Sequence, residues 1–393
     1  MHQRLYLVII HLTAVLSLIA AQTTESLITT AAQIAQSLRS TFPSPSLTLV
    51  PQPYYWWESG LANTALLTYA FITGDKQYED LAKNTLYNQA TAANDFMTPE
   101  ATGNDDQAWW ALAALTAAEN NVPVQPGAPS FLSMAQNVFN EQKSRWYADT
   151  CSGGLKWKIR AGDPGYEYKS SITNGLFFQL AARLGKLTGD VDALNWAEKT
   201  YDWVLSVGLI DGDYNVFDGT DDTKGCIDVN HDQWSYNAGV FLYGAAVMAA
   251  ETGDQKWVDR TSGLLDAAQR NFVRDGALVE TKCKGDGSCN TDQVFFKGIM
   301  AGCLGATAVL TPAVGEAVAG MMVELAARIQ STLVPNQGVA DYYVGLQVVN
   351  AAIMARGDAS TATMAGMISS RSSNDSISNL GRRSIAGRVW WKR

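Results

Sequence analysis

The sequence predicts an all-α fold, an (α/α)6 barrel of six helical hairpins, from two features that recur along the chain. The first is a set of six segments that are apolar on nearly all sides, spaced 48, 66, 61, 60 and 49 residues apart. These segments begin near Trp57, Asp105, Ser171, Asp232, Asp292 and Asp341. A helix that is apolar all round is buried. The second is that the segments between them, such as 78–90 and 194–207, alternate polar and apolar residues at helical spacing, so each buried helix is paired with an amphipathic one.

The turn inside each hairpin carries its own signal, the tripeptide Thr-Gly-Asp. It occurs at 73–75, 188–190 and 252–254, each time between an apolar segment and an amphipathic one that contains Trp or Tyr. Glycine after a helix and aspartate before the next are typical of a helix end followed by a helix start. Each repeat is therefore predicted to be a helical hairpin.

The starts of three apolar helices share a second frame, Asn-x-Asp-Gln, at 104–107, 230–233 and 290–293. An Asn with a Gln three residues later is a variant of the capping box, and acids in the first turn favour the helix dipole. The frame itself therefore needs only a structural explanation. Only the first copy carries two adjacent carboxylates, Asp105 and Asp106. The extra acid is not accounted for by capping and needs a different explanation.

Long loops precede several of the inner helices, at 43–55, 146–169 and 211–230. All inner helices of such a barrel run the same way, so these loops and the helix N-termini form one rim, where we expect the ligand cleft. Short strands connecting the loops are the only β-structure expected. Aromatic residues gather at this rim: Tyr54, Tyr55, Trp56, Trp57, Trp109, Trp110, Trp157, Tyr166, Tyr168, Trp234 and Tyr236. Such rings stack on sugars, although a Trp in a buried helix is more often part of the core.

Three regions are expected along the chain. Arg4 followed by the apolar run 5–20 and small residues at 20 and 21 indicates a secretory signal peptide, residues 1–21, rather than a membrane anchor. Residues 22–357 form the barrel. Residues 358–393 are expected to be a disordered tail rich in Ser and Arg, with the N-glycosylation sequon at Asn374 and without the apolar stretch of a GPI signal.

Composition limits the partners of the chain. A net charge of −9 and an isoelectric point near 4.9 argue against nucleic acid. Beyond the signal peptide no membrane span is expected. In an oxidising compartment disulfides are expected: Cys283 with Cys289 first, because they bracket a Gly-rich loop, and Cys151 with Cys226 second, which leaves Cys303 as a buried thiol.

The pair Asp105 and Asp106 is the best candidate for catalysis, because glycoside hydrolysis needs one ionised and one protonated carboxyl group. The alternative is that both acids only decorate a helix N-terminus. Neither a metal site nor a cofactor is expected: no third acid follows one turn later, and Val216 stands where a calcium loop of the EF-hand type needs Gly. His231 is the only histidine after the signal peptide, and no nucleophile elbow or phosphate-binding glycine loop occurs.

Six motifs in order resemble glycoside hydrolase family 76, over about residues 38–356. They are 54–60 (YYWWESG), 103–110 (GNDDQAWW), 153–157 (GGLKW), 174–175 (NG), 214–219 (YNVFDG) and 234–239 (WSYNAG). The resemblance implies the (α/α)6 barrel and a retaining mechanism, with Asp105 as nucleophile and Asp106 as general acid/base. Expected substrate contacts are Trp57, Glu58, Trp109, Trp110, Tyr166, Asp228, Trp234 and Tyr236.

The resemblance implies a secreted endo-α-1,6-mannosidase (mannan endo-1,6-alpha-mannosidase) that hydrolyses α-1,6-linked mannan of fungal cell walls. One alternative is a transglycosylase that links GPI-glycan mannose to cell-wall glucan with the same two aspartates. The other is a mannan-binding wall protein without catalysis. The expected location is extracellular or in the cell wall.

Overall fold

The computed structural model describes residues 23–283, 288–332 and 337–357, and most of these residues lie in α-helices. Six helices form the inner ring: α3 (Trp56–Thr73), α5 (Asn104–Glu119), α7 (Ser171–Thr188), α9 (Ser235–Thr252), α11 (Gln293–Leu310) and α13 (Val339–Ala355). Six surround them: α2 (Thr24–Ser40), α4 (Glu79–Gln89), α6 (Phe131–Ser144), α8 (Val191–Ser206), α10 (Gln255–Phe272) and α12 (Pro312–Thr332).

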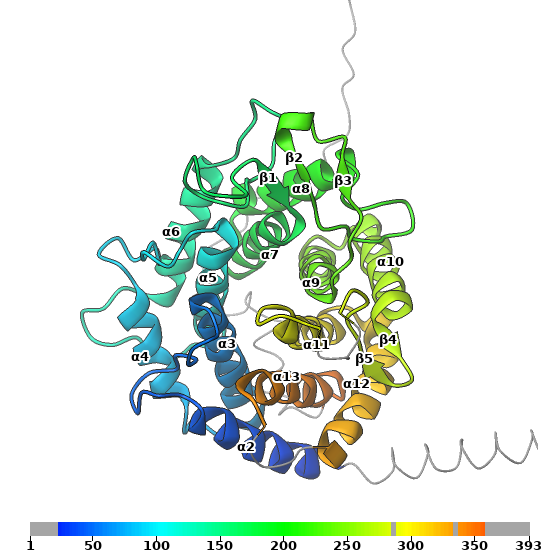
Figure 1. Cartoon of the computed structure of the whole chain (residues 1–393). Coiled ribbons are helices and arrows are strands. Elements are labelled where there is room, and N and C mark those ends of the chain that lie inside the picture. The colour runs from blue at the N-terminus through cyan, green and yellow to red at the C-terminus, as the bar shows by residue number, and fades with distance from the viewer. Residues whose placement is uncertain (1–22, 284–287, 333–336, 358–393) are drawn as a thin grey trace, which may run out of the picture.

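The inner helices close into a ring (Figure 1). Each packs on the next in chain order, and α13 returns to pack on α3. Every outer helix contacts an inner one, for example α8 on α7 and α10 on α9. The predicted (α/α)6 barrel is therefore confirmed, and the inner helices begin within three residues of their predicted starts.

Close contacts between inner helices depend on small residues. A Cβ atom on Gly305 of α11 would lie 2.6 Å from the Cα of Ala351 in α13. A Cβ on Gly239 of α9 would lie 2.9 Å from the Cα of Met300 in α11. Because the blocking atoms belong to the backbone, no rotamer change could make room. The glycines therefore set the spacing of the ring.

The predicted hairpin turns are also confirmed. Gly74, Gly189 and Gly253 each end an inner helix in the left-handed conformation, with φ of +76°, +72° and +66°, which glycine adopts at no steric cost. Asp190 and Asp254 then cap α8 and α10 by accepting a backbone hydrogen bond from the residue two positions later.

The shared Asn-x-Asp-Gln frame has three different structures. Only in the third copy do Asn290 and Gln293 exchange the predicted side-chain to backbone hydrogen bonds, both 3.0 Å, although α11 itself begins at Gln293 with Asp292 as its N-cap residue. In the first copy Gly103 is the N-cap residue, and Asn104 and Gln107 point into buried polar contacts with neighbouring loops. In the second copy the helix begins only at Ser235, after the frame. The capping prediction was wrong for these two copies.

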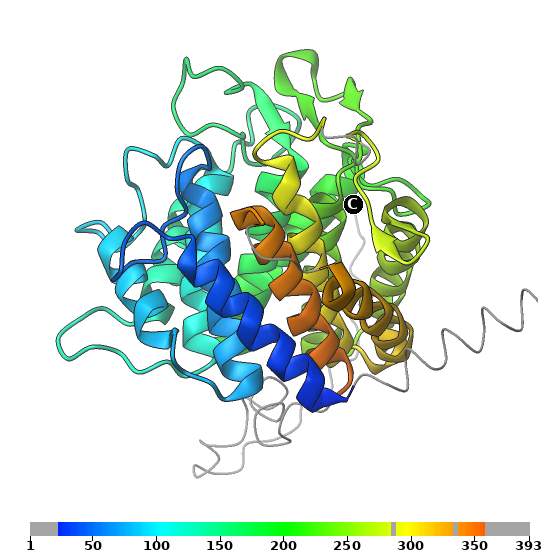
Figure 2. The ribbon, with the colours of Figure 1, turned by 60° about the horizontal axis from the view of Figure 1, so that its bottom comes forward.

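The rim carries the only strands among the described residues. β1 (Tyr168–Ser170), β2 (Gly219–Asp221) and β3 (Val229–Asn230) form an antiparallel sheet in the order β1-β2-β3, with a 3-10 turn, η1 (Asp222–Lys224), between β2 and β3. β4 (Val273–Arg274) and β5 (Ala277–Leu278) form a short hairpin after α10. Figure 2 shows the three-stranded sheet and the long loops together at one end of the barrel.

Both predicted disulfides are present, Cys151–Cys226 and Cys283–Cys289, and Cys303 is a buried thiol. Within the described residues α11 is long and apolar enough to cross a membrane, but it is an inner helix of the barrel and mostly buried. The expected signal peptide, the expected tail and Asn374 lie outside the described residues.

Candidate active site

A cleft of about 890 Å³ opens at the rim, where the sequence predicted it. Five inner helices contribute residues of their first turn or the cap before it, because all of them start at this end. The lining residues are Leu49, Val50, Gln52, Tyr54, Tyr55, Trp56, Trp57, Ser59, Glu100, Thr102, Asp105, Asp106, Trp109, Trp157, Lys158, Tyr168, Ser170, Ile172, Asp218, Trp234, Tyr236, Asn290, Asp292, Gln293 and Phe296.

Asp105 and Asp106 both line this cleft, as second and third residues of α5. Consecutive side chains diverge along a regular helix, but here the two carboxylates have different local partners. Asp106 turns back to the helix start, where its Oδ2 accepts the N–H of Gly103 at 2.7 Å. Asp105 accepts the N–H of Asp106 at its Oδ1, 3.0 Å, and the indole N–H of Trp157 at its Oδ2, 2.8 Å. Helix start and indole together hold the pair in place.

The absence of a side chain at Gly103 makes room for this arrangement. A Cβ there would lie 2.1 Å from Oδ1 of Asp105 and 3.3 Å from Oδ2 of Asp106. The φ angle of Gly103 is −110°, which any residue can adopt. Any other residue here would displace the Asp105 carboxylate, so glycine keeps the arrangement through the space it leaves and not through its backbone conformation.

The electrostatics of the pair favour one bound proton. Burial, followed by the charge of Asp106, raises the pKa of Asp105 to about 7. Burial also raises the pKa of Asp106, against the hydrogen bond from Gly103, which lowers it. Two carboxyl groups this close repel as anions, so the second proton is lost only at higher pH.

Three further acids in the cleft, Glu100, Asp218 and Asp292, were not among the predicted site residues. Asp218 accepts the phenol O–H of Tyr168 at 2.7 Å, and Asp292 accepts the indole N–H of Trp57 at 3.3 Å. Burial raises the pKa of Asp218 and of Asp292. The signals were present, since Asp218 lies in the motif 214–219 and Asp292 in the third Asn-x-Asp-Gln frame, but both suit turns and caps equally well.

Most of the predicted rim aromatics lie in the cleft. Trp57, Trp109, Trp234 and Tyr236 all line it. The rings of Trp57 and Trp109 stack at 5.7 Å between centroids, and Tyr236 stacks on Phe296 at 3.8 Å. Flat aromatic faces of this kind beside carboxylates are suited to a sugar, whose C–H groups pack on rings while its hydroxyls bond to the acids.

Four predicted substrate contacts lie elsewhere. Glu58 is fully buried beneath the cleft wall, where its Oε2 accepts the N–H of Tyr55 and burial raises its pKa to about 9. Trp110 is fully buried between Trp56 and Phe96.

The other two predicted contacts are on the rim. Tyr166 lines a separate hollow of about 430 Å³ that shares Trp157 and Tyr168 with the cleft. Asp228 is exposed and pairs with Lys224. The structure thus places all four outside the lining of the cleft, because sequence position put them near the rim without fixing the direction of their side chains.

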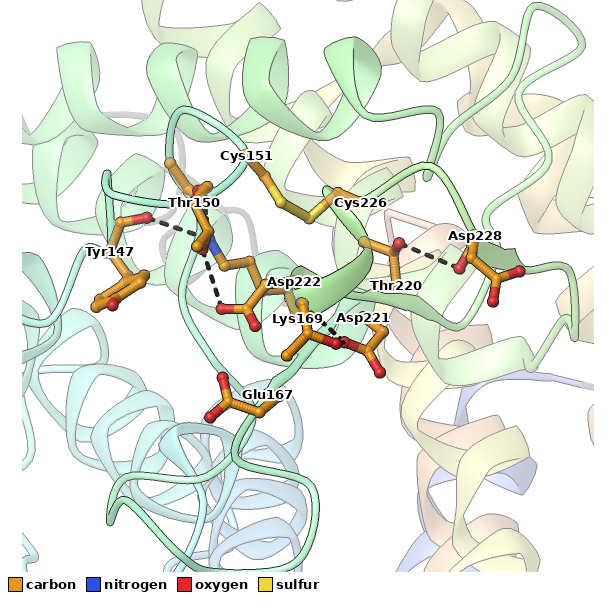
Figure 3. The surroundings of a disulfide bond; sticks show 12 residues. Tyr147, Thr150, Cys151, Glu167, Lys169, Thr220, Asp221, Asp222, Cys226 and Asp228 are labelled. Carbon is orange, nitrogen blue, oxygen red and sulfur yellow. Dashed lines mark hydrogen bonds between the residues drawn. A yellow bond between two sulfur atoms is a disulfide. The ribbon is translucent and has the colours of Figure 1, made fainter.

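The rim loops are tied together beside β1 (Figure 3). The disulfide joins Cys151 in the loop before β1 to Cys226 in the loop after η1. Next to it the buried ammonium group of Lys169 donates to the carbonyl oxygens of Tyr147, Thr150 and Gly153, at 3.1, 2.8 and 2.5 Å. Burial lowers the pKa of Lys169 to about 8. These bonds hold the loop that leads to Trp157 and the cleft.

Comparison with known proteins places the chain in a family. Residues 23–362 match glycosyl hydrolase family 76. Mannan endo-1,6-alpha-mannosidase DCW1 of Saccharomyces cerevisiae is 44% identical over 268 residues, and DFG5 of the same yeast is 38% identical over 267. These alignments cover 66% of this chain, and 59% and 58% of the two relatives, so they span less than two thirds of either relative.

Solved structures agree with the fold. Dfg5 from Chaetomium thermophilum, in complex with glucosamine, superposes with a TM-score of 0.81 at 30% identity, covering 85% of this chain and 91% of that one. A second structure is that of the α-1,6-mannanase GH76A of Salegentibacter sp. HEL1_6 in complex with α-1,6-mannotriose, an inactive variant with two consecutive aspartates replaced by asparagine. It superposes with a TM-score of 0.69 at 18% identity, covering 84% of this chain and 99% of that one. The match over most of its length shows that this chain belongs to glycosyl hydrolase family 76.

Proposed function

We propose that this chain is a retaining glycosidase that cleaves α-1,6-linked mannan within the polymer. One observation carries the proposal: two adjacent carboxyl groups, Asp105 and Asp106, lie in a cleft walled by Trp and Tyr rings. The names of the relatives support the substrate, since DCW1 and DFG5 are called mannan endo-1,6-alpha-mannosidases. An inactive mannanase variant of the same fold, changed at two consecutive aspartates, supports the choice of residues.

The hydrogen bonds favour Asp105 as the nucleophile. Both of its oxygens accept N–H groups, from Asp106 and from Trp157, and these donors have no lone pair to receive a carboxyl proton. These two hydrogen bonds favour the anion, against burial, which raises the pKa of Asp105 to about 7. The anion attacks the anomeric carbon of a mannosyl unit and forms a covalent glycosyl-enzyme.

Asp106 is then the general acid/base. In the first step it donates a proton to the glycosidic oxygen as the bond to the leaving sugar breaks. In the second step it takes a proton from the incoming acceptor, whose oxygen attacks the anomeric carbon and releases Asp105. Water as acceptor gives hydrolysis and another sugar gives transglycosylation. GPI-glycan mannose as donor and cell-wall glucan as acceptor are therefore compatible with the same residues.

The proposal includes the place of action. The apolar run near the N-terminus of the sequence and the two disulfides support export to an oxidising compartment. The polymer that the relatives are named for is a wall component, so the protein is proposed to act outside the cell, in or near the wall.

The test uses purified protein with α-1,6-mannan, with and without an excess of short mannosyl or glucan acceptors, and resolves products by mass. Shorter mannan fragments identify a hydrolase, and elongated acceptors a transglycosylase. An unchanged polymer in both reactions refutes the proposal and favours the mannan-binding alternative. Asp105→Asn should lose at least about 10³-fold in kcat. The matched control is Asp228→Asn, which removes a rim carboxylate outside the cleft and should retain activity.

A further inference from the structure

A short segment, residues 157–159, lies antiparallel against residues 102–104, directly before the two aspartates. Asn104 N–H donates to the carbonyl of Trp157 at 2.9 Å, and Ile159 N–H to that of Thr102 at 3.0 Å, with Gly103 and Lys158 paired between them. The segment therefore places the side chains of Trp157 and Lys158 next to the start of α5. Trp157 reaches Asp105, as described above.

Lys158 reaches the other aspartate through one intermediate group. Its Nζ donates to the hydroxyl oxygen of Thr102 at 3.0 Å, and that hydroxyl donates to Oδ2 of Asp106, also at 3.0 Å. An ammonium group has protons and no lone pair, so the first bond can run in one direction only. Since the Thr102 oxygen accepts from Lys158, its single proton is directed to Asp106.

This direction matters because of what else bonds to the same oxygen. Oδ2 of Asp106 also accepts the N–H of Gly103 at 2.7 Å and the N–H of Thr102 at 3.2 Å. Three donors converge on Oδ2, which leaves it no room for a proton of its own. Oδ1 accepts no hydrogen bond from another described residue, so the carboxyl proton is accommodated there.

We propose that Lys158, acting through the hydroxyl of Thr102, is a positioning residue that reserves Oδ1 of Asp106 for proton transfer to and from the substrate. The inference rests on the proposed role of Asp106. In the first step the Oδ1–H bond breaks and the proton goes to the glycosidic oxygen, which keeps the electron pair of the broken bond to the anomeric carbon, while Asp105 bonds to that carbon. In the second step the acceptor oxygen bonds to the anomeric carbon as the bond from that carbon to Asp105 breaks, and the proton of the acceptor hydroxyl goes to Oδ1.

The charges around the pair make Lys158 hard to replace. Besides Asp105, the carboxylate of Asp292 acts on Asp106, and Glu100 and Asp218 line the same cleft. Lys158 is the only Lys or Arg among the described residues of the lining. Its ammonium also lies 4.0 Å from the centroid of the Trp157 ring. The charge of Lys158 opposes the repulsion among the acids. Its hydrogen bond, through Thr102, determines which oxygen of Asp106 stays free for the proton.

Thr102→Val separates the hydrogen bond from the charge, because it removes the hydroxyl and leaves Lys158 in place. We expect kcat on α-1,6-mannan to fall at least about 10²-fold, the range of general acid catalysis. An aryl α-1,6-mannobioside with an acidic phenol as leaving group needs no proton, so its first step should fall less than about threefold. Thr102→Ser keeps the hydroxyl and should restore mannan turnover.

Lys158→Met removes both the hydrogen bond to Thr102 and the positive charge. Lys158→Arg keeps the charge and an N–H donor, and a guanidinium group, like an ammonium group, cannot accept a hydrogen bond. We expect the methionine variant to lose mannan turnover like Thr102→Val and to have its pH optimum moved upward, since a cation that favours the ionised acids is gone. Lys158→Arg should keep the wild-type optimum. Lys224→Met, which removes a rim cation paired with Asp228, is the control. It should leave the turnover of both substrates and the pH optimum unchanged.

A second measurement does not depend on turnover: 13C NMR titration of aspartate carboxyl carbons in the ligand-free protein, with Asp106→Asn to assign the signal. The Asp106 midpoint should rise in Thr102→Val and Lys158→Met and stay in Lys224→Met. An unchanged titration midpoint of Asp106 in Thr102→Val and Lys158→Met overturns the inference. An equal fall of kcat on mannan and on the aryl substrate in Thr102→Val overturns it as well. If the wild type cleaves no mannan, the proposed function fails, and the titration alone decides whether Lys158 and Thr102 act on Asp106.

Discussion

At the scale of single residues, Asp105 links protonation to folding. Its pKa is raised to about 7 in the folded protein, from an ordinary value of 3.8. The folded state therefore binds this proton more tightly than the unfolded chain. The stability that comes from the neutral carboxyl is fully present below pH 3.8 and is lost as the pH rises through 7.

Asp105→Asn should remove this dependence. At pH 4 variant and wild type should differ little, and by pH 8 the variant should be the more stable, by at most about 4 kcal/mol for a shift of three pH units. Denaturant unfolding of both proteins from pH 4 to 8 measures the difference. A constant offset between variant and wild type from pH 4 to 8 would contradict the raised pKa of Asp105.

Gly103 gives a second prediction at this scale. Gly103→Ala puts a Cβ where Oδ1 of Asp105 now lies, so the carboxylate must turn away. A displacement of about 1 Å at a reacting group costs on the order of 10²-fold in rate. We expect that loss in kcat with a melting temperature within a few degrees of wild type. Gly212→Ala, on an open part of the rim, should show neither change; full activity in Gly103→Ala would show that the carboxylate tolerates the shift.

At the scale of elements, the two disulfides differ in the length of chain they close. Cys151–Cys226 joins residues 75 apart and ties the loop before β1 to the loop after η1, whereas Cys283–Cys289 spans only 6. Chain entropy grows with the logarithm of loop length, which gives about 4 kcal/mol for the long loop and about 2 kcal/mol for the short one.

Replacing Cys151 and Cys226 together by Ala should therefore destabilise the protein about twice as much as replacing Cys283 and Cys289. Chemical unfolding of the two double variants measures the ratio. The first pair should also reduce activity, because its loops lead to Trp157 and Tyr168 in the cleft. Equal losses of stability would mean that native contacts at the rim, such as those of Lys169, outweigh the effect of the crosslinks on the unfolded chain.

The elements were predictable where a single physical cause determines the pattern. Apolar residues on all sides of a segment have one explanation, burial, so the inner helices and the end of the barrel that holds the cleft were found from sequence. The direction of each side chain in the first turn of an inner helix is not determined by a single physical cause, so no sequence pattern indicates it. Trp109 and Trp110 are neighbours in one motif, yet the first lines the cleft and the second lies in the core.

Contacts made by distant segments were harder still. The pairing of residues 102–104 with 157–159 joins two loops, and loops have no periodicity from which a partner can be inferred. Trp157 was recognisable as a rim aromatic. Lys158 was not, because a lysine in a loop is ordinarily a solvated charge. The same holds for Asp218 and Asp292, whose residue types suit turns and helix starts as well as a site.

At the scale of the whole molecule, the ring depends on the close approach of its inner helices. Gly305→Ala forces α11 away from α13, since the blocking atom is the Cα of Ala351. Overpacking against backbone costs about 1 to 3 kcal/mol or more, and we expect a lower melting temperature together with reduced activity as the ring distorts.

Gly320→Ala is the matched control, an exposed glycine in the outer helix α12 with open space around it. It should stabilise the protein by up to about 1 kcal/mol, because alanine is the better helix former. Thermal unfolding of both variants measures the contrast. Similar shifts in the two would show that helix propensity, and not the spacing of the ring, governs these positions.

The common direction of the inner helices has an electrical consequence. Each helix start carries roughly half a positive elementary charge from its unpaired N–H groups, and five of these starts meet at the cleft that holds Asp105, Asp106, Asp218 and Asp292. Much of the counter-charge for the acids is thus part of the scaffold and cannot diffuse away. Dissolved ions screen exposed charges over about 10 Å at 0.1 M, but they cannot replace peptide dipoles fixed in position. The barrel therefore acts as a permanent counterion for its own active site.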